Sequence, residues 1–246
     1  TAAAIVLAGC GLKVAKHGNR ALSSKSGAAD ALAGLGVDLD APFDRIERAI
    51  AEAGVGVLMA PRPHPAMRSV MPTRIALGVR TVFNILGPLT NPACVDRILI
   101  GVFDPAWLTP IAETLARLGT KRAWVVHGAG GLDEVSTLGP TQVAALADGV
   151  VTRFEITPAD ADLPLATLDG LKGGDAAANA AKIRALLRGE TGPYRDIVVL
   201  NAAAALVAYG EAADLRAGAV RAAAALDDGA AAGALDRFAA ITKGTA

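Results

Sequence analysis

The sequence contains 246 residues, of which 52% are hydrophobic and 4% aromatic, and its 24 lysines and arginines balance 24 aspartates and glutamates. This length suits one large domain or two small ones and is ample for a hydrophobic core. Zero net charge argues against general nucleic-acid binding and against a polybasic membrane tether, because both need a cationic surface. The charged fraction of 20% argues against disorder. No uninterrupted apolar run approaches the ~18 residues of a membrane-spanning helix.

The two cysteines, Cys10 and Cys94, lie far apart and lack the spacing of a metal site. They form no disulfide framework, which predicts a cytoplasmic protein. The chain begins at Thr1 with an apolar helical pattern and no basic region before it, so no signal peptide is predicted. A helix that starts at residue 1 without an N-cap leads us to expect that the chain begins partway through a larger protein.

Helical patterns and short apolar strands alternate along the chain, which predicts an α/β fold. Helices are expected over 2–12, 27–35, 43–53, 107–118, 175–188, 196–209, 214–226 and 233–242, and strands over 14–15, 55–59, 97–103 and 122–127. The third strand, the helix after it and the fourth strand form a predicted right-handed βαβ unit. Residues 143–156 predict a hairpin that turns at Asp148-Gly149. Pro72 predicts a helix break or a new first turn.

Donors of hydrogen bonds and positive charge are concentrated between the first strand and the second helix, in the run KHGNRALSSKSG from Lys16 to Gly27. Glycines let backbone N–H groups approach an anion, and a helix N-terminus adds a favourable dipole. A solvated polar loop is the alternative for any one of these residues. Their density after a buried strand favours a site for a phosphate-rich ligand.

Asp133 and Glu134 follow the strand that ends at His127-Gly128. In α/β sheets, ligands bind at the carboxyl ends of strands. Adjacent carboxylates repel each other unless a cation lies between them, and hard oxygen ligands beside phosphates suggest Mg²⁺. A pair of exposed loop acids is the alternative.

Two further segments could contribute to a binding site, but a purely structural role explains each of them as well. An Arg such as Arg74, ten residues after His64, could hold a carboxylate in a bidentate pair. Spacing alone favours a capping His64 and a surface Arg74 instead. Residues 80–92 contain two proline turns after an apolar stretch, which predicts either a rigid loop that lines a pocket or a purely structural turn.

The motifs VAKHGNRALSSKSG, HPAM, RTVFNILGPLTNP and GLDEVS, in this order and spacing, closely resemble those of the anthranilate phosphoribosyltransferase family over essentially the whole chain. The resemblance implies transfer of a phosphoribosyl group from phosphoribosyl pyrophosphate (PRPP) to anthranilate, with Mg²⁺ as cofactor. It implies a nucleoside phosphorylase/phosphoribosyltransferase-like catalytic domain over residues 1–246, with a mostly parallel sheet flanked by helices. It also implies a remnant of a small helical domain, with residues 61–80 packed against the rest of that domain, and a homodimer.

The resemblance also implies residue roles, which we carry over position by position. The residues implied in PRPP binding are Thr1, Lys16, His17, Gly18, Asn19, Arg20, Ser23, Ser24 and Ala28. Those implied in anthranilate binding are Asn19, His64, Arg74 and Gly87. Lys16, Asn19 and Arg74 are the implied catalytic residues, and Asp133 and Glu134 the implied magnesium ligands.

Three departures from the family pattern affect these expectations. The family's Gly-Thr-Gly-Gly-Asp loop, and the Ser before Thr1 that helps to bind one magnesium, would lie upstream of this sequence. Ala28 stands where the family often has Ser, which puts one phosphate contact in question. We therefore expect residues 1–246 alone to have little or no transferase activity.

Two alternative functions are a pyrimidine nucleoside phosphorylase-like enzyme and a non-catalytic, nucleic-acid-binding relative of the same fold. The motifs GLDEVS and KHGNR favour the transferase, and the neutral charge disfavours nucleic-acid binding.

Overall fold

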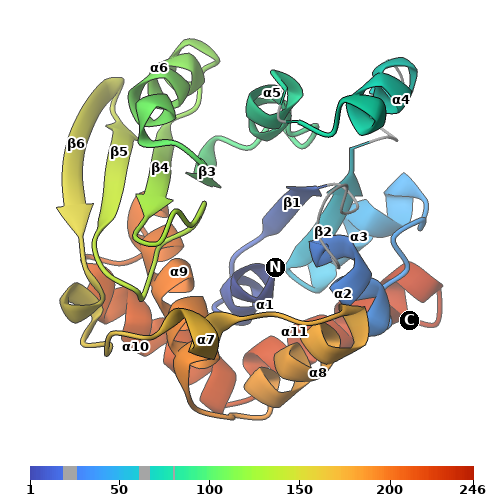
Figure 1. Ribbon diagram of the computed structural model, residues 1–246. Coiled ribbons are helices and arrows are strands. Elements are labelled where there is room, and N and C mark those ends of the chain that lie inside the picture. Colours follow the sequence, from blue (N-terminus) through green and yellow to red (C-terminus); the bar gives the residue numbers. More distant parts are fainter. Residues whose placement is uncertain (19–26, 61–66, 80) are drawn as a thin grey trace. The chain divides into compact units, whose positions relative to one another are not determined.

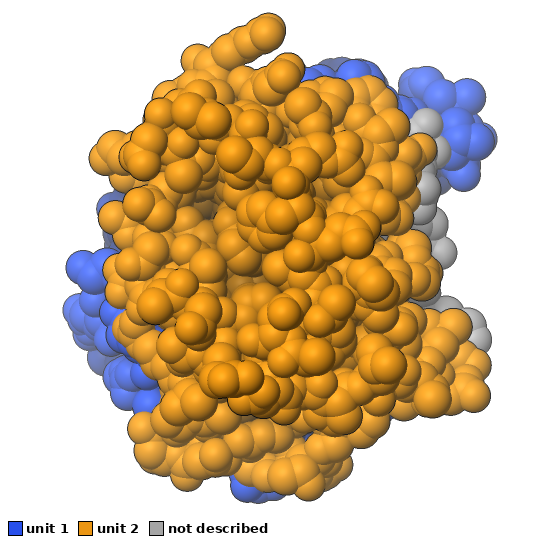
Figure 2. Space-filling view, turned by 90° about the vertical axis from the view of Figure 1, so that its left-hand side faces the viewer, with its two compact units in different colours: residues 1–94, 173–188, 229–246 blue, residues 95–172, 189–228 orange. Residues whose placement is uncertain are grey.

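The structure is a computed structural model that describes residues 1–18, 27–60, 67–79 and 81–246. The chain forms two compact units, which Figure 2 colours separately. Unit 1 comprises residues 1–94, 173–188 and 229–246, and unit 2 comprises residues 95–172 and 189–228. Each unit has its own sheet and its own buried side chains, so each is described by itself.

Unit 1 builds a two-stranded parallel sheet surrounded by helices (Figure 1). Its elements are α1 (Ala2–Gly9), β1 (Val14–Gly18), α2 (Ala28–Gly34), α3 (Phe43–Glu52), β2 (Val55–Met59), α4 (Met67–Leu77), α5 (Phe83–Leu89), α8 (Ala176–Leu187) and α11 (Ala230–Lys243). Helix α11 packs against α1 and α3. Gly9 permits the close approach of α1 to α11, because a Cβ there would lie 2.7 Å from the backbone nitrogen of Ala231.

The sheet of unit 1 is held by an apolar cluster that also orients β1. Ala41, Ile46 and Leu58 are buried together, and the half-buried Ala15 and Ile50 pack against them. Side chains alternate between the two faces of a strand, so the residue after Ala15 points to the opposite face. That residue is Lys16, and the same packing that buries Ala15 therefore directs the lysine away from the cluster.

Unit 2 is a four-stranded sheet in the order β3-β4-β5-β6, flanked by helices (Figure 1). Its elements are β3 (Arg97–Gly101), η1 (Pro105–Trp107), α6 (Leu108–Arg117), β4 (Arg122–Gly128), β5 (Thr141–Ala147), β6 (Val150–Ile156), η2 (Pro158–Ala161), α7 (Leu168–Leu171), α9 (Pro193–Tyr209) and α10 (Leu215–Asp227). Residues 123–126 of β4 are all buried, which means that both faces of the sheet are covered. Helices α6 and α9 both pack against β4.

Most of the predicted elements are confirmed. Strands β3 and β4 are parallel and α6 connects them, as expected of a βαβ unit. Strands β5 and β6 form the predicted hairpin, with positive φ angles of 51° at Asp148 and 79° at Gly149. The α/β class is therefore confirmed. The pairings β4-β5 and β5-β6 are antiparallel, so the sheet of unit 2 is mixed rather than mostly parallel.

Three local predictions were wrong. Strand β1 continues through Lys16–Gly18, which the sequence placed in a polar loop. Helix α4 runs through Pro72 without a break. Pro72 stands in the middle of this helix and cannot donate to the carbonyl four residues before it, so α4 forms in spite of the lost hydrogen bond. Residues 83–89 form helix α5 and not a loop, with Pro88 one residue from its end.

Within the described ranges, no helix combines the length and the apolarity needed to cross a membrane.

Candidate active site

The end of β1 carries the first group of predicted site residues. Lys16, His17 and Gly18 are half-buried and pair with β2. His17 Nδ1 lies 3.2 Å from the carbonyl oxygen of Gly87 in α5. The side-chain amide of Asn91 donates to the carbonyl of Ala15, at 2.9 Å. The structure thus brings a residue predicted to bind PRPP, His17, next to one predicted to bind anthranilate, Gly87.

Arg74 lies on α4 and contacts the same helix, α5. Its guanidinium carbon is 5.4 Å from the centroid of the Phe83 ring, a cation–π contact that holds the half-buried side chain over the first residue of α5. Gly87, one turn further along α5, faces His17. Spacing alone favoured a surface charge at Arg74, and the structure instead places this arginine in contact with a neighbouring helix.

Thr1 and Ala28 lie at the N-terminal ends of two helices of unit 1. The carbonyl of Thr1 accepts hydrogen bonds from the backbone of Ala4 and Ile5 at the start of α1. Ala28 is the exposed first residue of α2. The N–H of Gly27 donates to the Asp30 carboxylate at 2.8 Å, so a side chain of α2 itself satisfies this donor.

The remaining predicted residues of unit 1 are Asn19, Arg20, Ser23, Ser24 and His64, which lie outside the described residues.

In unit 2, Asp133 and Glu134 lie in the loop that joins β4 to β5, called here the acid loop (residues 129–137). The loop begins with a reverse turn in which Gly128 and Leu132 exchange backbone hydrogen bonds, at 2.8 and 3.2 Å. Both acidic side chains are exposed, and the next three residues, 135–137, are buried. Two carboxylates are therefore presented to solvent from a base that is fixed in the interior.

Two glycines let the acid loop lie directly on the ends of the strands. A Cβ at Gly101, the last residue of β3, would collide with the backbone carbonyl of Asp133. A Cβ at Gly128, the last residue of β4, would collide with the carbonyl of Glu134. Because backbone lies against backbone here, any larger residue would displace the two acids.

Buried polar side chains form hydrogen bonds with the backbone of the acid loop. The hydroxyl of Ser136 donates to the carbonyl of Ala129 at 2.9 Å and accepts from the N–H of Leu138 at 3.0 Å. The N–H of Ser136 itself donates to Thr141 Oγ1. Asn201 of α9 bonds to both backbone groups of Val135. The loop conformation is thus specified by its own interior contacts.

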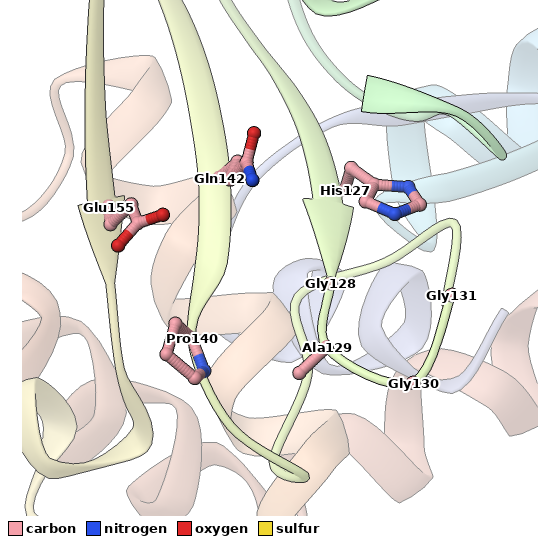
Figure 3. A pocket seen from close by; sticks show the side chains of 8 residues that line it. All are labelled: His127, Gly128, Ala129, Gly130, Gly131, Pro140, Gln142 and Glu155. Carbon is pink, nitrogen blue, oxygen red and sulfur yellow. The ribbon is translucent and has the colours of Figure 1, made fainter. Parts of the chain in front are cut away.

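A hollow of about 240 Å³ adjoins the acid loop (Figure 3). The residues that line it are His127, Gly128, Ala129, Gly130, Gly131, Pro140, Gln142 and Glu155. His127, Gln142 and Glu155 occupy matching positions on the neighbouring strands β4, β5 and β6. His127 Nδ1 lies 2.9 Å from the carbonyl of Val102, which fixes the ring orientation.

Tyr194, in the first turn of α9, is electrostatically coupled to the acid loop. Burial and, secondarily, the negative charge of Glu134 raise the pKa of Tyr194 to about 12. The phenol therefore stays protonated at neutral pH and adds no negative charge near the two acids.

The acid pair fits a magnesium site that the protein and its substrate form together. Within the part of the chain that the structure describes, no group of three or more His, Cys, Asp and Glu side chains is arranged to hold a metal ion. Mg²⁺ is commonly bound through one or two carboxylates together with substrate phosphates and water. The exposed carboxylates of Asp133 and Glu134 meet this requirement.

The sequence did not assign roles to Gly101, Gly128, Ser136 or Asn201. A signal existed for one of them, because Asn201 is a lone amide at the start of the apolar run NAAAALVAY in a predicted helix. A polar group in such a position must find a buried partner. Nothing in the sequence identifies that partner as Val135, which is 66 positions away.

Comparison with known proteins agrees with this architecture. The model of the glycosyl transferase family, a/b domain, matches residues 1–232, which defines the class of protein. Anthranilate phosphoribosyltransferase from Rhodospirillum rubrum is 60% identical over 98% of this chain and 70% of its own length. The enzyme of that name from Azorhizobium caulinodans is 56% identical over 100% of this chain and 72% of its own length. The chain therefore belongs to the anthranilate phosphoribosyltransferase family.

Solved structures show the same relationship in three dimensions. The crystal structure of anthranilate phosphoribosyltransferase from Thermus thermophilus matches 98% of this chain and 72% of its own, with a TM-score of 0.92 and 49% identity. The enzyme from Saccharomyces cerevisiae, in complex with PRPP and Mg, covers 99% of this chain and 69% of its own, with a TM-score of 0.87 and 29% identity.

Proposed function

We propose that this protein transfers the phosphoribosyl group of PRPP to anthranilate, giving N-(5-phosphoribosyl)anthranilate and pyrophosphate, a step of tryptophan biosynthesis. The observation that carries the proposal is the 60% identity to a relative of that name over 98% of the chain. The acid pair on its fixed loop supplies the chemistry that the reaction needs. The rival reading, a pyrimidine nucleoside phosphorylase, has no comparable observation in its favour.

The reaction makes one bond and breaks one at the anomeric carbon of the ribose. The anthranilate nitrogen forms a bond to this carbon, the bond from the carbon to the pyrophosphate oxygen breaks, and the nitrogen loses a proton. An aniline nitrogen is already neutral at pH 7, so the step requires no strong general base. Catalysis then rests on holding the two substrates in line and on stabilising the departing pyrophosphate.

For the leaving group, we assign the metal site to Asp133 and Glu134. Magnesium bound there neutralises negative charge on the pyrophosphate oxygens. The yeast relative was solved with PRPP and Mg, which supports this assignment. The loop backbone, which lies against Gly101 and Gly128, keeps both carboxylates exposed.

For the substrates, we assign PRPP to the end of β1 and to the residues after it. Lys16 would contribute a positive charge, and the backbone of His17 and Gly18, with Asn19, Arg20, Ser23 and Ser24, would contribute donors. Thr1 and Ala28 belong to the same proposed set. Among the described residues, nothing lies within 4 Å of a Cβ built at Gly18, which is compatible with a ligand beside this backbone.

For anthranilate, we assign the carboxylate to Arg74, with Asn19, His64 and Gly87 lining the pocket. A guanidinium binds a carboxylate through two parallel hydrogen bonds, which suits a substrate whose carboxyl group is planar and rigid. The contact of Arg74 with Phe83 restricts the arginine side chain before the substrate arrives, which lowers the entropy lost on binding.

The assembly of the protein is also a proposal. We assign residues 1–246 to one catalytic domain and expect residues 61–80 to pack against a helical domain of the kind that the resemblance implies. Ile75, Leu77 and Val79 support this, because each is more than half exposed although apolar. We further propose a homodimer that acts in the cytoplasm.

One assay distinguishes the proposed function from its rival. Anthranilate is fluorescent, so its consumption is followed directly after addition of PRPP and MgCl₂ to residues 1–246 joined to the upstream segment that the resemblance implies. The proposal predicts consumption that requires both additions and releases one pyrophosphate per anthranilate. Phosphorolysis of uridine or thymidine, without consumption of anthranilate, would establish the phosphorylase instead.

A further inference from the structure

Asn201 lies in α9, is 7% exposed, and stands at the head of an alanine-rich stretch of the helix. Its side-chain oxygen accepts a hydrogen bond from the N–H of Val135 at 3.0 Å. Its nitrogen donates to the carbonyl of Val135 at 2.7 Å and to the carbonyl of Ile197 at 2.9 Å. One amide thus clamps both backbone groups of a single loop residue and uses both of its own N–H donors.

The clamped residue comes directly after Glu134. The N–H of Val135 belongs to the same peptide plane as the carbonyl of Glu134, and that carbonyl lies against Gly128. Asn201 and Gly128 therefore fix one peptide plane from two sides. The carbonyl of Asp133 lies against Gly101 in the same way. Both acids are thus attached to a backbone that has little freedom to move.

We propose that Asn201 is a positioning residue for Asp133 and Glu134: through its two hydrogen bonds to Val135, it holds the two carboxylates in the arrangement that binds the divalent cation. This inference rests on the metal site assigned under the proposed function. Residues that orient metal ligands from behind typically change metal affinity by about 10- to 100-fold when they are replaced.

Among the other side chains, only Gln carries the same amide group, on a chain one methylene longer. Leu and Ala have no polar atom, and Ser is too short to reach both groups of Val135. A buried Asp would face the carbonyls of Val135 and Ile197, which disfavour its ionised form. The protonated carboxyl keeps the acceptor for the N–H of Val135 and one donor, and loses only the second donor. The two variants Asn201→Ala and Asn201→Asp therefore remove the clamp to different extents, and Ala also suits the surrounding helix.

The chain offers a control with the same hydrogen-bond chemistry, at a more exposed position, in Asn179 of α8. Its side-chain oxygen accepts from the N–H of Gly174 at 2.9 Å, and its nitrogen donates to the carbonyl of Gly174 at 3.0 Å. The chemistry of the clamp is the same, but it acts in unit 1 and on a segment without a predicted site residue. Asn179→Ala measures what the loss of such a clamp does to the protein in general.

The test is a titration of the protein with Mn²⁺ alone, in which the EPR signal reports the concentration of the free ion. The proteins titrated are the wild type, both Asn201 variants, Asn179→Ala and the double variant Asp133→Asn with Glu134→Gln. We expect binding to weaken about tenfold or more in Asn201→Ala, and less in Asn201→Asp, with wild-type affinity in Asn179→Ala. The concentration of Mg²⁺ for half-maximal rate should rise by the same factor as the Mn²⁺ dissociation constant, while the KM for anthranilate stays unchanged. Circular dichroism and thermal unfolding identify the variants that fold, and Asn201→Asp carries the test if Asn201→Ala does not fold.

Two results would overturn the inference alone: wild-type Mn²⁺ affinity in a folded Asn201 variant, or an equal loss of affinity in Asn179→Ala. Wild-type affinity in the double acid variant would have a different meaning, because it would remove the assigned metal site and with it the ground for the inference. The two failures are therefore distinguishable in one set of titrations.

Discussion

The end of β1 and the acid loop after β4 both present polar groups at the end of a strand, but they are held in place differently. Beside β1, no described residue lies within 4 Å of a Cβ built at Gly18, and the contacts come from the sheet pairing with β2 and from His17 and Asn91. Beside β4, Gly128 is in contact with backbone, and buried Asn201 and Ser136 bond to the loop. Among the described residues, the end of β1 therefore leaves room for a ligand, whereas the acid loop presents ligating groups on a preformed support.

The largest effect is expected from removing the two acids. The double variant Asp133→Asn with Glu134→Gln should lower kcat/KM by about a thousandfold or more, because the departing pyrophosphate loses its charge stabilisation. The fold should be unchanged, since both side chains are exposed. Asp236→Asn, at an exposed position of α11, is the control. A rate that remains at the wild-type level across a magnesium titration would contradict the assignment.

The next largest effect is expected on stability, when Gly128 and Gly18 are each replaced by alanine. Gly128→Ala should lower the free energy of unfolding by about 2–3 kcal/mol, because the added Cβ meets the backbone of Glu134 and the side chain of Ser136. Gly18→Ala should change it by less than about 0.5 kcal/mol, because the added methyl meets none of the residues that the structure describes. Urea denaturation measures both. Equal losses of stability in the two variants would refute the distinction between the two strand ends.

Removal of the positive charge at the end of β1 tests whether this strand end binds the pyrophosphate group. Lys16→Ala should weaken binding of magnesium pyrophosphate about 30-fold, the equivalent of about 2 kcal/mol for a hydrogen bond to a charged group. Lys13→Ala is the matched control, since Lys13 is exposed just before the other end of the same strand. Calorimetry with magnesium pyrophosphate provides the measurement. An equal loss in both variants would show a general effect of charge and not a contact.

Arg74 should act on the other substrate. Arg74→Ala is expected to raise the KM for anthranilate about 30-fold, because a charged hydrogen bond to the carboxylate is worth about 2 kcal/mol. The KM for PRPP should change much less. Arg74→Lys keeps the charge but lacks the planar fork, and its KM for anthranilate should lie between those of the wild type and Arg74→Ala. A parallel rise of both KM values would mean that Arg74 does not bind the carboxylate.

The elements predicted correctly were those whose signals are local. The apolar run of β2, the Asp148-Gly149 turn and the βαβ spacing each depend on neighbouring residues, and the structure confirms them. Pro88 lies one residue from the end of α5, where a proline interrupts little of the hydrogen-bond ladder. Pro72 lies in the middle of α4, and this helix forms although a proline is costly there.

The exposed acids of the site could be predicted from the sequence, but the residues that support their loop could not. The motif at Asp133 and Glu134 stands out in the sequence because carboxylates after a strand have a recognisable chemistry. Their support does not, because Asn201 reaches Val135 across 66 positions and Gly101 contacts Asp133 from a different strand. Such partners follow from the tertiary fold, which a pattern of neighbouring residues does not specify.

The smallest expected effect compares two hydroxyl groups, each of which bonds to a backbone carbonyl beside one strand end. Ser136 is fully buried, and Ser136→Ala should lower the free energy of unfolding by about 1–2 kcal/mol, because the N–H of Leu138 and the carbonyl of Ala129 both lose a partner. Thr90 is exposed, and its hydroxyl donates to the carbonyl of Gly87 at 3.1 Å. Thr90→Val should cost less than about 0.5 kcal/mol, because water replaces the lost donor. Urea denaturation of both variants gives the difference, and a cost for Thr90→Val as large as that for Ser136→Ala would mean that the end of β1 is as rigidly supported as the acid loop.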